Sequence, residues 1–231
     1  GVKTVIAVPE GANPGKVESM QNLGANVIFH GEVFDDSLAY AERLAREEGY
    51  RFIHSANEPH LIAGVGTTTL EIIEDLPDVD VIIVPVGGGS GACGACIAAK
   101  SITPDIQVIG VQSAQAPAVY LSWKEGRIVD AAMKTVAEGL ATRSSYELPN
   151  GILRDMLDDF VIATDEELEQ AVVLNLEKTH NLTEHAGASP LAAALKIRDR
   201  LRGKKVALVM SGGNISVPQL KSALAKVRPQ Q

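Results

Sequence analysis

Short apolar runs rich in valine and isoleucine alternate with helix-forming segments along the whole chain. This alternation is typical of α/β proteins, in which crossover helices join parallel strands. The run at residues 79–86 is almost continuously aliphatic, as expected for a strand that is covered on both faces. We therefore predict an α/β fold with open, mostly parallel sheets and helices on both faces. The predicted strands are residues 4–8, 26–30, 51–54, 79–86, 107–111, 159–163 and 205–210.

Helical periodicity appears between these strands, and two of the helices carry start signals. Asp165 is followed by Glu166 and Glu167, which gives a cap and an acidic first turn. Ser189 is followed by Pro190, a residue that favours the first position of a helix. The predicted helices are residues 13–23, 35–48, 59–75, 116–125, 166–180 and 189–201.

Residues 126–157 form a long stretch of weak periodicity with one Pro-Asn-Gly turn signal at residues 149–151. Connections of this length are uncommon in compact folds and often carry function. We therefore predict a functional connection in this part of the chain.

Charge and composition exclude several classes of protein. The formal net charge is −8 and both signs are interspersed, so no basic stripe is present to attract nucleic acid. No apolar run approaches the roughly 20 residues that span a bilayer, and the chain opens on a strand-like segment without a signal-peptide pattern. We expect a cytoplasmic protein without nucleic-acid or membrane partners.

Cys93 and Cys96 are too few for a disulfide framework and are interpreted as packing residues, with a redox pair as the alternative.

A glycine cluster follows the most apolar strand and leads into a helix of small residues; its sequence is Gly87-Gly88-Gly89-Ser90-Gly91. A phosphate group needs several backbone N–H donors and tolerates no intruding Cβ atom, and a helix N-terminus adds a favourable dipole. We therefore predict a phosphate site at these five residues, which we call the glycine loop. A tight strand-to-helix turn without a ligand is the alternative.

Two well-known phosphate motifs fit the glycine loop less well. A Walker motif requires a lysine at its end, and the loop has none. The dinucleotide fingerprint matches residues 89–94, but the next strand ends in Gln112 and Ser113, where an acidic residue would bind the ribose. A single phosphate monoester is therefore favoured, and an NAD-binding oxidoreductase is kept as a rival.

Two further segments place reactive side chains at the ends of predicted elements. Ser211 follows a strand, and ligands in open α/β sheets gather at the carboxyl ends of strands. Its hydroxyl is suited to a cofactor ring nitrogen, or else it caps the following helix. Glu184 and His185 precede a helix, and both side-chain types do acid–base work when partly buried. For His185 alone, a surface or capping role is favoured.

Further motifs accompany the glycine loop in a fixed order along the chain. They are Pro-x6-Lys at residues 9–16, Leu-Gly-Ala-x-Val at 23–27, Ile-Ala-Gly-x-Gly-Thr at 62–67, Ala-Glu-Gly at 137–139, Glu-x-x-Gly-Ala at 184–188 and Ser-Gly-Gly-Asn at 211–214. In this order they resemble the fold-type II pyridoxal-phosphate enzymes, within them the branch of threonine dehydratase, serine dehydratase and serine racemase. The resemblance covers the chain almost from end to end, and it is the shared order that makes it specific.

This resemblance implies pyridoxal 5′-phosphate as the cofactor. The amides of the glycine loop would bind its phosphate, Ser211 would face its pyridine nitrogen, and Glu138 and Gly139 would lie at its other edge beside the substrate. In racemase-like members an acidic residue in this region helps to hold a divalent cation, which makes Glu138 the candidate metal ligand. The implied cofactor-binding residues are Gly87, Gly88, Gly89, Ser90, Gly91, Glu138, Gly139, Ser211, Gly212 and Asn214.

The resemblance also implies a reaction. A lyase of this branch removes the α-proton and the β-hydroxyl of threonine or serine and yields a 2-keto acid and ammonia. A serine or aspartate racemase, or a hydroxyaspartate dehydratase, is the alternative within the family. From another class, the alternative is a non-catalytic protein that binds pyridoxal phosphate or phosphate alone. Homodimerisation is implied by the family only.

The family's cofactor-bonding lysine lies in a Ser-x-Lys-x-Arg-Gly segment, accompanied by an Asn-His-Ala/Gly-Gln motif that binds the substrate carboxylate. Neither segment occurs in this sequence, and none of its eleven lysines has the required context. Lys16 matches a family motif but is interpreted as a solvated helix residue. We therefore expect no catalytic lysine in this chain and an N-terminal part that is missing or present as a separate piece. Residues 1–55 would then be the remnant of a smaller mobile domain, and residues 56–231 the larger cofactor-binding domain.

Overall fold

The structure, a computed structural model, describes residues 1–226 and divides the chain into two compact units, Gly1–His54 and the part from Ser55 onward. Both units are built from parallel strands and helices, which confirms the predicted α/β class. Among the described residues, six of the seven predicted strands are present.

The first unit contains a two-stranded parallel sheet and two helices. Val5 of β1 (Val5–Val8) pairs with Asn26 of β2 (Asn26–Phe29). α1 (Pro14–Asn22) begins where the side chain of Asn13 accepts hydrogen bonds from two backbone amides, and α2 (Phe34–Glu48) ends at Gly49 in the left-handed conformation. The prediction of a strand at residues 51–54 was wrong, since these residues form no regular structure. In the described part of the chain no neighbouring strand pairs with them.

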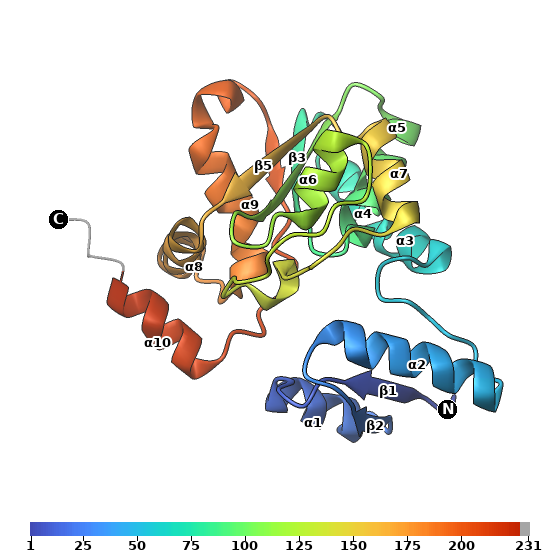
Figure 1. Ribbon diagram of the computed structural model, residues 1–231. Coiled ribbons are helices and arrows are strands. Elements are labelled where there is room, and N and C mark those ends of the chain that lie inside the picture. Colours follow the sequence, from blue (N-terminus) through green and yellow to red (C-terminus); the bar gives the residue numbers. More distant parts are fainter. Residues whose placement is uncertain (227–231) are drawn as a thin grey trace. The chain divides into compact units, whose positions relative to one another are not determined.

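The second unit is built on a four-stranded parallel sheet in the order β5-β4-β3-β6. Figure 1 labels β3 and β5 of this sheet. The central strands β3 (Val81–Pro85) and β4 (Gln107–Ser113) are almost wholly buried. The outer strands are β5 (Asp159–Ala163) and β6 (Val206–Leu208). Because all four strands are parallel, their carboxyl ends lie at one edge of the sheet.

Helices cover both faces of this sheet, as predicted. On β3, Ile82 and Val84 pack with α5, while Val81 and Ile83 point to the other face and pack with α9. The helices of this unit are α3 (Pro59–Val65), α4 (Thr67–Asp75), α5 (Ser90–Ile102), α6 (Ala118–Glu125), α7 (Glu147–Met156), α8 (Asp165–Thr179), α9 (His185–Lys196) and α10 (Val217–Lys226), with the 3-10 helices η1 (Glu138–Leu140) and η2 (Arg198–Leu201).

Two helix predictions were wrong, one because of packing and one because a proline was misinterpreted. The helix predicted at residues 59–75 is divided at Gly66 into α3 and α4, where α5 approaches so closely that a Cβ on Gly94 would lie 2.7 Å from the Gly66 nitrogen. α7 was missed, since Pro149 was interpreted as a turn signal. Pro149 occupies the third position of α7, where the missing N–H costs no intrahelical bond.

Two helix starts also differ from the prediction. α8 is capped by Thr164, which forms a capping box with Glu167, so Asp165 is the first helical residue and not the cap. α9 begins four residues before the predicted start, and Pro190 lies inside it. The helix tolerates this proline because the Ser189 hydroxyl donates to the Ala186 carbonyl at 2.8 Å, the acceptor that residue 190 would otherwise use.

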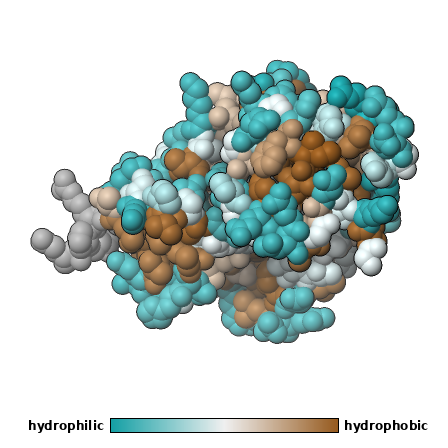
Figure 2. Space-filling model, turned by 90° about the horizontal axis from the view of Figure 1, so that it is seen from below, coloured by the Kyte–Doolittle hydropathy of each residue, from teal (hydrophilic) through white to brown (hydrophobic). Residues whose placement is uncertain are grey.

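No described helix is long and apolar enough to cross a membrane. On the face that Figure 2 displays, apolar patches interrupt a mostly hydrophilic surface. The exposed large apolar side chains of the second unit include Leu70, Ile97 and Ile102.

Candidate active site

The glycine loop joins the end of β3 to the start of α5 and has the geometry of an anion site. Gly89 adopts φ +98° directly before the first turn of α5, a conformation that favours glycine. Within the described part of the chain, the amides of residues 88–91 have no hydrogen-bond acceptor. They are therefore free to bind an anion at the positive end of the helix dipole.

Backbone and side-chain atoms of other segments lie close to Gly87 and Gly88. A Cβ on Gly87 would overlap the carbonyl oxygen of Gly139, and a Cβ on Gly88 would lie 2.5 Å from the Cβ of Ala56. A side chain at either position would displace the loop. Packing thus requires glycine at positions 87 and 88, and the positive φ favours it at position 89, whereas a Cβ on Gly91 would meet no atom within 4 Å. A simple turn needs fewer glycines.

Ser211 leaves the sheet at the same edge as the glycine loop. β6 pairs with β3 through Leu208 and Ile83, and the Val209 amide donates to the Ile83 carbonyl at 3.0 Å. Ser211 follows three residues after Leu208, and its side chain is exposed. The two predicted features therefore belong to adjacent parallel strands, at the edge where α/β sheets bind ligands.

Three more segments meet beside this edge. A Cβ on Gly139 would lie 2.8 Å from the Cβ of Ala186, which brings η1 against the first turn of α9. The Glu184 amide donates to the Gly212 carbonyl at 3.0 Å, and a Cβ on Gly187 would lie 2.5 Å from the same oxygen. Together with the contact between Gly87 and Gly139, these contacts join the predicted residues Gly87, Gly139 and Gly212, and Glu138 and Asn214 line the pocket beside them.

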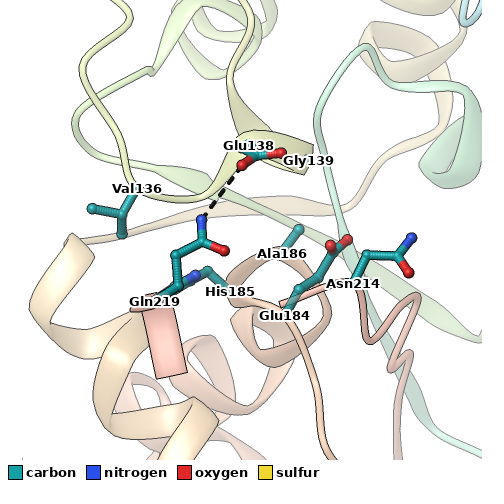
Figure 3. Close-up of a pocket in the computed structure, with 8 residues that line it drawn as sticks. All are labelled: Val136, Glu138, Gly139, Glu184, His185, Ala186, Asn214 and Gln219. Carbon is teal, nitrogen blue, oxygen red and sulfur yellow. Dashed lines mark hydrogen bonds between the residues drawn. The ribbon is translucent and has the colours of Figure 1, made fainter. Parts of the chain in front are cut away.

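A small pocket lies where these segments meet (Figure 3). Figure 3 shows Glu138 above the start of α9, with the carboxylate of Glu184 directed toward Asn214. The polar lining of the pocket comes from η1, the start of α9, the segment after β6, and α10. The lining residues are Val136, Glu138, Gly139, Glu184, His185, Ala186, Asn214 and Gln219.

Gln219 is a site residue that the sequence did not reveal. Its side-chain amide donates to Glu138 at 3.4 Å from α10 (Figure 3). Gln219 lies five residues beyond the last recognised motif, so only the return of α10 toward η1 places it here. The divalent cation predicted at Glu138 gains no support, since the described residues contain no group of three or more His, Cys, Asp or Glu side chains that could hold a metal ion.

His185 is buried, with 3% of its surface exposed, so the predicted surface role was wrong. It is the first residue of α9, and its Nε2 atom has no hydrogen-bond partner in the described part of the chain. Burial lowers the pKa of His185 below its usual 6.5, although the nearby Glu169 carboxylate opposes the shift. The imidazole is therefore neutral at pH 7.

Acid should destabilise the protein through His185. Because its pKa is lower in the folded than in the unfolded state, unfolding takes up a proton, and stability falls as the pH drops below 6.5. We expect His185→Asn to flatten the pH dependence of the free energy of unfolding between about pH 5 and 6.5. Urea titrations at several pH values measure this difference, and equal slopes in the two proteins would contradict it. The pKa of His54 is also lowered by burial, but His54 is present in both proteins, so its contribution to the difference in pH dependence cancels.

Cys93 and Cys96 lie inside the core against the face of the sheet covered by α5. Burial raises the pKa of each thiol to about 12, and the Cys93 thiol donates to the Pro149 carbonyl at 3.5 Å. Both thiols are therefore protonated at neutral pH. This environment favours the packing interpretation over a redox pair.

No lysine lines the pocket in the described part of the chain. Lys16 lies in α1 of the first unit. Five others are bound to acceptors elsewhere: Lys100 to Asp158, Lys196 to Glu167, Lys204 to Gln107, Lys205 to Asp78 and Lys226 to Glu169. The expectation that this chain holds no cofactor-bonding lysine stays a prediction.

Comparison with known proteins is consistent with this geometry. A model of the family "Pyridoxal-phosphate dependent enzyme" matches residues 1–212. The L-threonine ammonia-lyase of Thermotoga maritima is 40% identical over 227 residues, which are 98% of this chain and 56% of that protein. The catabolic L-threonine dehydratase TdcB of Escherichia coli is 35% identical over 223 residues, 95% of this chain and 68% of that protein.

Solved structures give the same result. Maize serine racemase superposes with a TM-score of 0.89 at 29% identity, covering 98% of this chain and 70% of that one. Threonine deaminase isoform 2 of Solanum lycopersicum has a TM-score of 0.91 at 26% identity, covering 97% and 66%. The chain spans only a little over half the length of the ammonia-lyases that it matches, 56% and 54%.

Proposed function

Because this chain belongs to the family of pyridoxal-phosphate-dependent enzymes, we propose that it supplies the cofactor-binding part of a threonine or serine ammonia-lyase. The complete enzyme would convert its substrate to a 2-keto acid and ammonia. The lysine that bonds to the cofactor would come from polypeptide outside residues 1–231.

One observation carries this proposal: the glycine loop and Ser211 lie at the same edge of the sheet, on the adjacent strands β3 and β6. The unpaired amides of the loop fit a phosphate monoester, and the exposed hydroxyl fits a ring nitrogen. A flat ligand with a phosphate at one end and a pyridine nitrogen at the other requires this pair of features.

Bound pyridoxal phosphate would supply an electron sink for the charge that develops at the substrate α-carbon. The residues of this chain would bind and tune it. The glycine-loop amides would hold the phosphate dianion, and η1 would close the site behind Gly87. Ser211 is neutral, so unlike an aspartate it does not force the ring nitrogen to stay protonated, which moderates electron withdrawal and suits elimination from the β-carbon.

Alternatives remain within and outside the family. A serine racemase activity is supported by the likeness to maize serine racemase, and hydroxyaspartate dehydration by the same fold. A non-catalytic phosphate or cofactor binder is the alternative from another class, and it would use the same free amides of the glycine loop. The NAD rival loses support, because Gln112 at the end of β4 is fully buried and accepts a hydrogen bond from the Tyr120 amide.

The division into two compact units supports assigning residues 1–55 to a smaller mobile domain and residues 56–231 to the cofactor-binding domain. Homodimerisation and a cytoplasmic location belong to the same proposal. The exposed Leu70, Ile97 and Ile102 are suited to an interface. Sedimentation equilibrium of the full coding-length protein tests the dimer.

Titration with pyridoxal phosphate tests the function. We expect the 231-residue chain to bind it, inorganic phosphate to compete, and pyridoxal without phosphate to bind at least about tenfold more weakly, because most of the polar contacts would be lost. Difference absorbance spectroscopy measures all three. Equal affinity for pyridoxal would contradict the assignment of the glycine loop.

Borohydride reduction followed by peptide mapping tests the lysine. We expect no single lysine of residues 1–231 to be modified stoichiometrically, and one lysine outside them to be modified in the full coding-length protein. One stoichiometrically labelled lysine within residues 1–231 would overturn this part of the proposal.

A further inference from the structure

The segment that carries Glu138 and Gly139 has little regular structure of its own. Between α6 and α7 the only regular element described is the three-residue η1. Yet the Gly139 carbonyl must stay against Gly87, where it fixes the outer side of the glycine loop. Something outside the segment must hold it in place.

The carboxylate of Asp165 makes the required contacts. One oxygen, Oδ1, accepts from the Thr135 hydroxyl at 2.6 Å and from the Ser113 hydroxyl at 3.2 Å. The other, Oδ2, accepts from the Val136 amide at 2.9 Å. Asp165 thus ties the end of β4 and the segment before η1 to the first residue of α8.

Neighbouring bonds make the same connection rigid. The Ala137 amide donates to the Thr135 hydroxyl at 3.1 Å, and the Asp165 amide donates to the Gln115 side chain at 3.1 Å. The Lys134 amide donates to the Gln115 carbonyl at 2.9 Å. Four consecutive residues are therefore fixed immediately before Glu138.

The carboxylate is suited to this role for two physical reasons. Ionised acceptors form stronger hydrogen bonds than neutral ones, and a negative charge at the first residue of a helix is stabilised by the helix dipole. An asparagine at position 165 would keep one acceptor oxygen. Its amide group would face the Val136 N–H as a second donor, so that bond would be lost.

We propose that Asp165 is a positioning residue that holds Glu138 and Gly139 against the glycine loop. Its effect on cofactor binding rests on the function proposed above; its effect on the segment does not. Asp165 does not line the pocket, and it acts through Thr135 and Val136.

Hydrogen exchange without cofactor tests the anchoring. In Asp165→Asn we expect the amides of Val136 and Ala137 to exchange at least about tenfold faster than in the unchanged protein, the order expected when a hydrogen bond to a charged group is lost. Glu166→Gln is the matched control, because it removes the same charge from the next, exposed residue of the first turn of α8. Unchanged exchange in Asp165→Asn, or equal acceleration in both variants, would overturn the anchoring.

Binding of pyridoxal phosphate tests the consequence for the site. We expect Asp165→Asn and Thr135→Val to weaken binding by about tenfold, while Thr135→Ser, which keeps the hydroxyl, binds normally. Circular dichroism and thermal melts confirm that each variant is folded. Faster exchange with unchanged affinity would overturn the role in the site. If the unchanged protein fails to bind the cofactor, the proposed function fails, while the exchange experiment still decides the anchoring.

Discussion

Gly87→Ala is expected to weaken binding of both pyridoxal phosphate and inorganic phosphate by about 5- to 150-fold, the equivalent of the roughly 1–3 kcal/mol typical of an inserted methyl group. The added Cβ would overlap the Gly139 carbonyl oxygen. Backbone lies on both sides of this contact, so no flexible side chain can move away. The glycine loop must shift, and its amides no longer converge on one anion. Equilibrium dialysis with phosphate and absorbance titration with pyridoxal phosphate measure the loss.

Gly151→Ala is the matched control for Gly87→Ala. Gly151 lies in α7, and a Cβ there would meet no atom within 4 Å. Alanine favours a helix interior over glycine by roughly 1 kcal/mol, so this variant should bind normally and melt at a slightly higher temperature. Normal phosphate binding by a folded Gly87→Ala protein would show that the anion site lies elsewhere.

Local sequence signals were sufficient for most of the fold. Continuous aliphatic runs such as β3 predict buried strands whatever lies around them, since few other structures bury every residue of such a run. The run at residues 51–54, Arg-Phe-Ile-His, is less apolar and has no partner strand in the described part of the chain, and a strand exists only when it is paired. The division at Gly66 likewise depends on the close approach of α5, which no local pattern encodes.

The candidate site shows the same limit. The glycine loop and Ser211 were predicted because backbone amides and a strand-end hydroxyl are encoded at single points in the chain. The burial of His185 and the bonds of Asp165 and Gln219 were missed, because each depends on an element that returns from elsewhere. Asp165 carried a local signal, but it was interpreted as a helix cap alone.

Gly187→Ala is expected to lower the free energy of unfolding by about 2 kcal/mol and to weaken cofactor binding as well. A Cβ at residue 187 would lie 2.5 Å from the Gly212 carbonyl oxygen and 3.1 Å from the Gly212 nitrogen. The first turn of α9 and the segment after β6 are therefore in backbone contact. Separating them displaces Ser211, because it directly precedes Gly212. If this contact only supported packing, the free energy of unfolding would fall and the affinity for the cofactor would not change. If it also positions the site, both the free energy of unfolding and the affinity fall.

Urea titration and absorbance titration of the same preparation separate these two effects of Gly187→Ala. Gly64→Ala is the matched control, because Gly64 lies in α3 and a Cβ there would meet no atom within 4 Å. It should leave the affinity for pyridoxal phosphate unchanged. A Gly187→Ala protein as stable as the unchanged chain would refute the close approach of α9, and a destabilised one with normal affinity would refute its link to Ser211. The expected loss of both stability and affinity would show that the position of Ser211 depends on the contact between Gly187 and the Gly212 backbone, which tolerates no side chain.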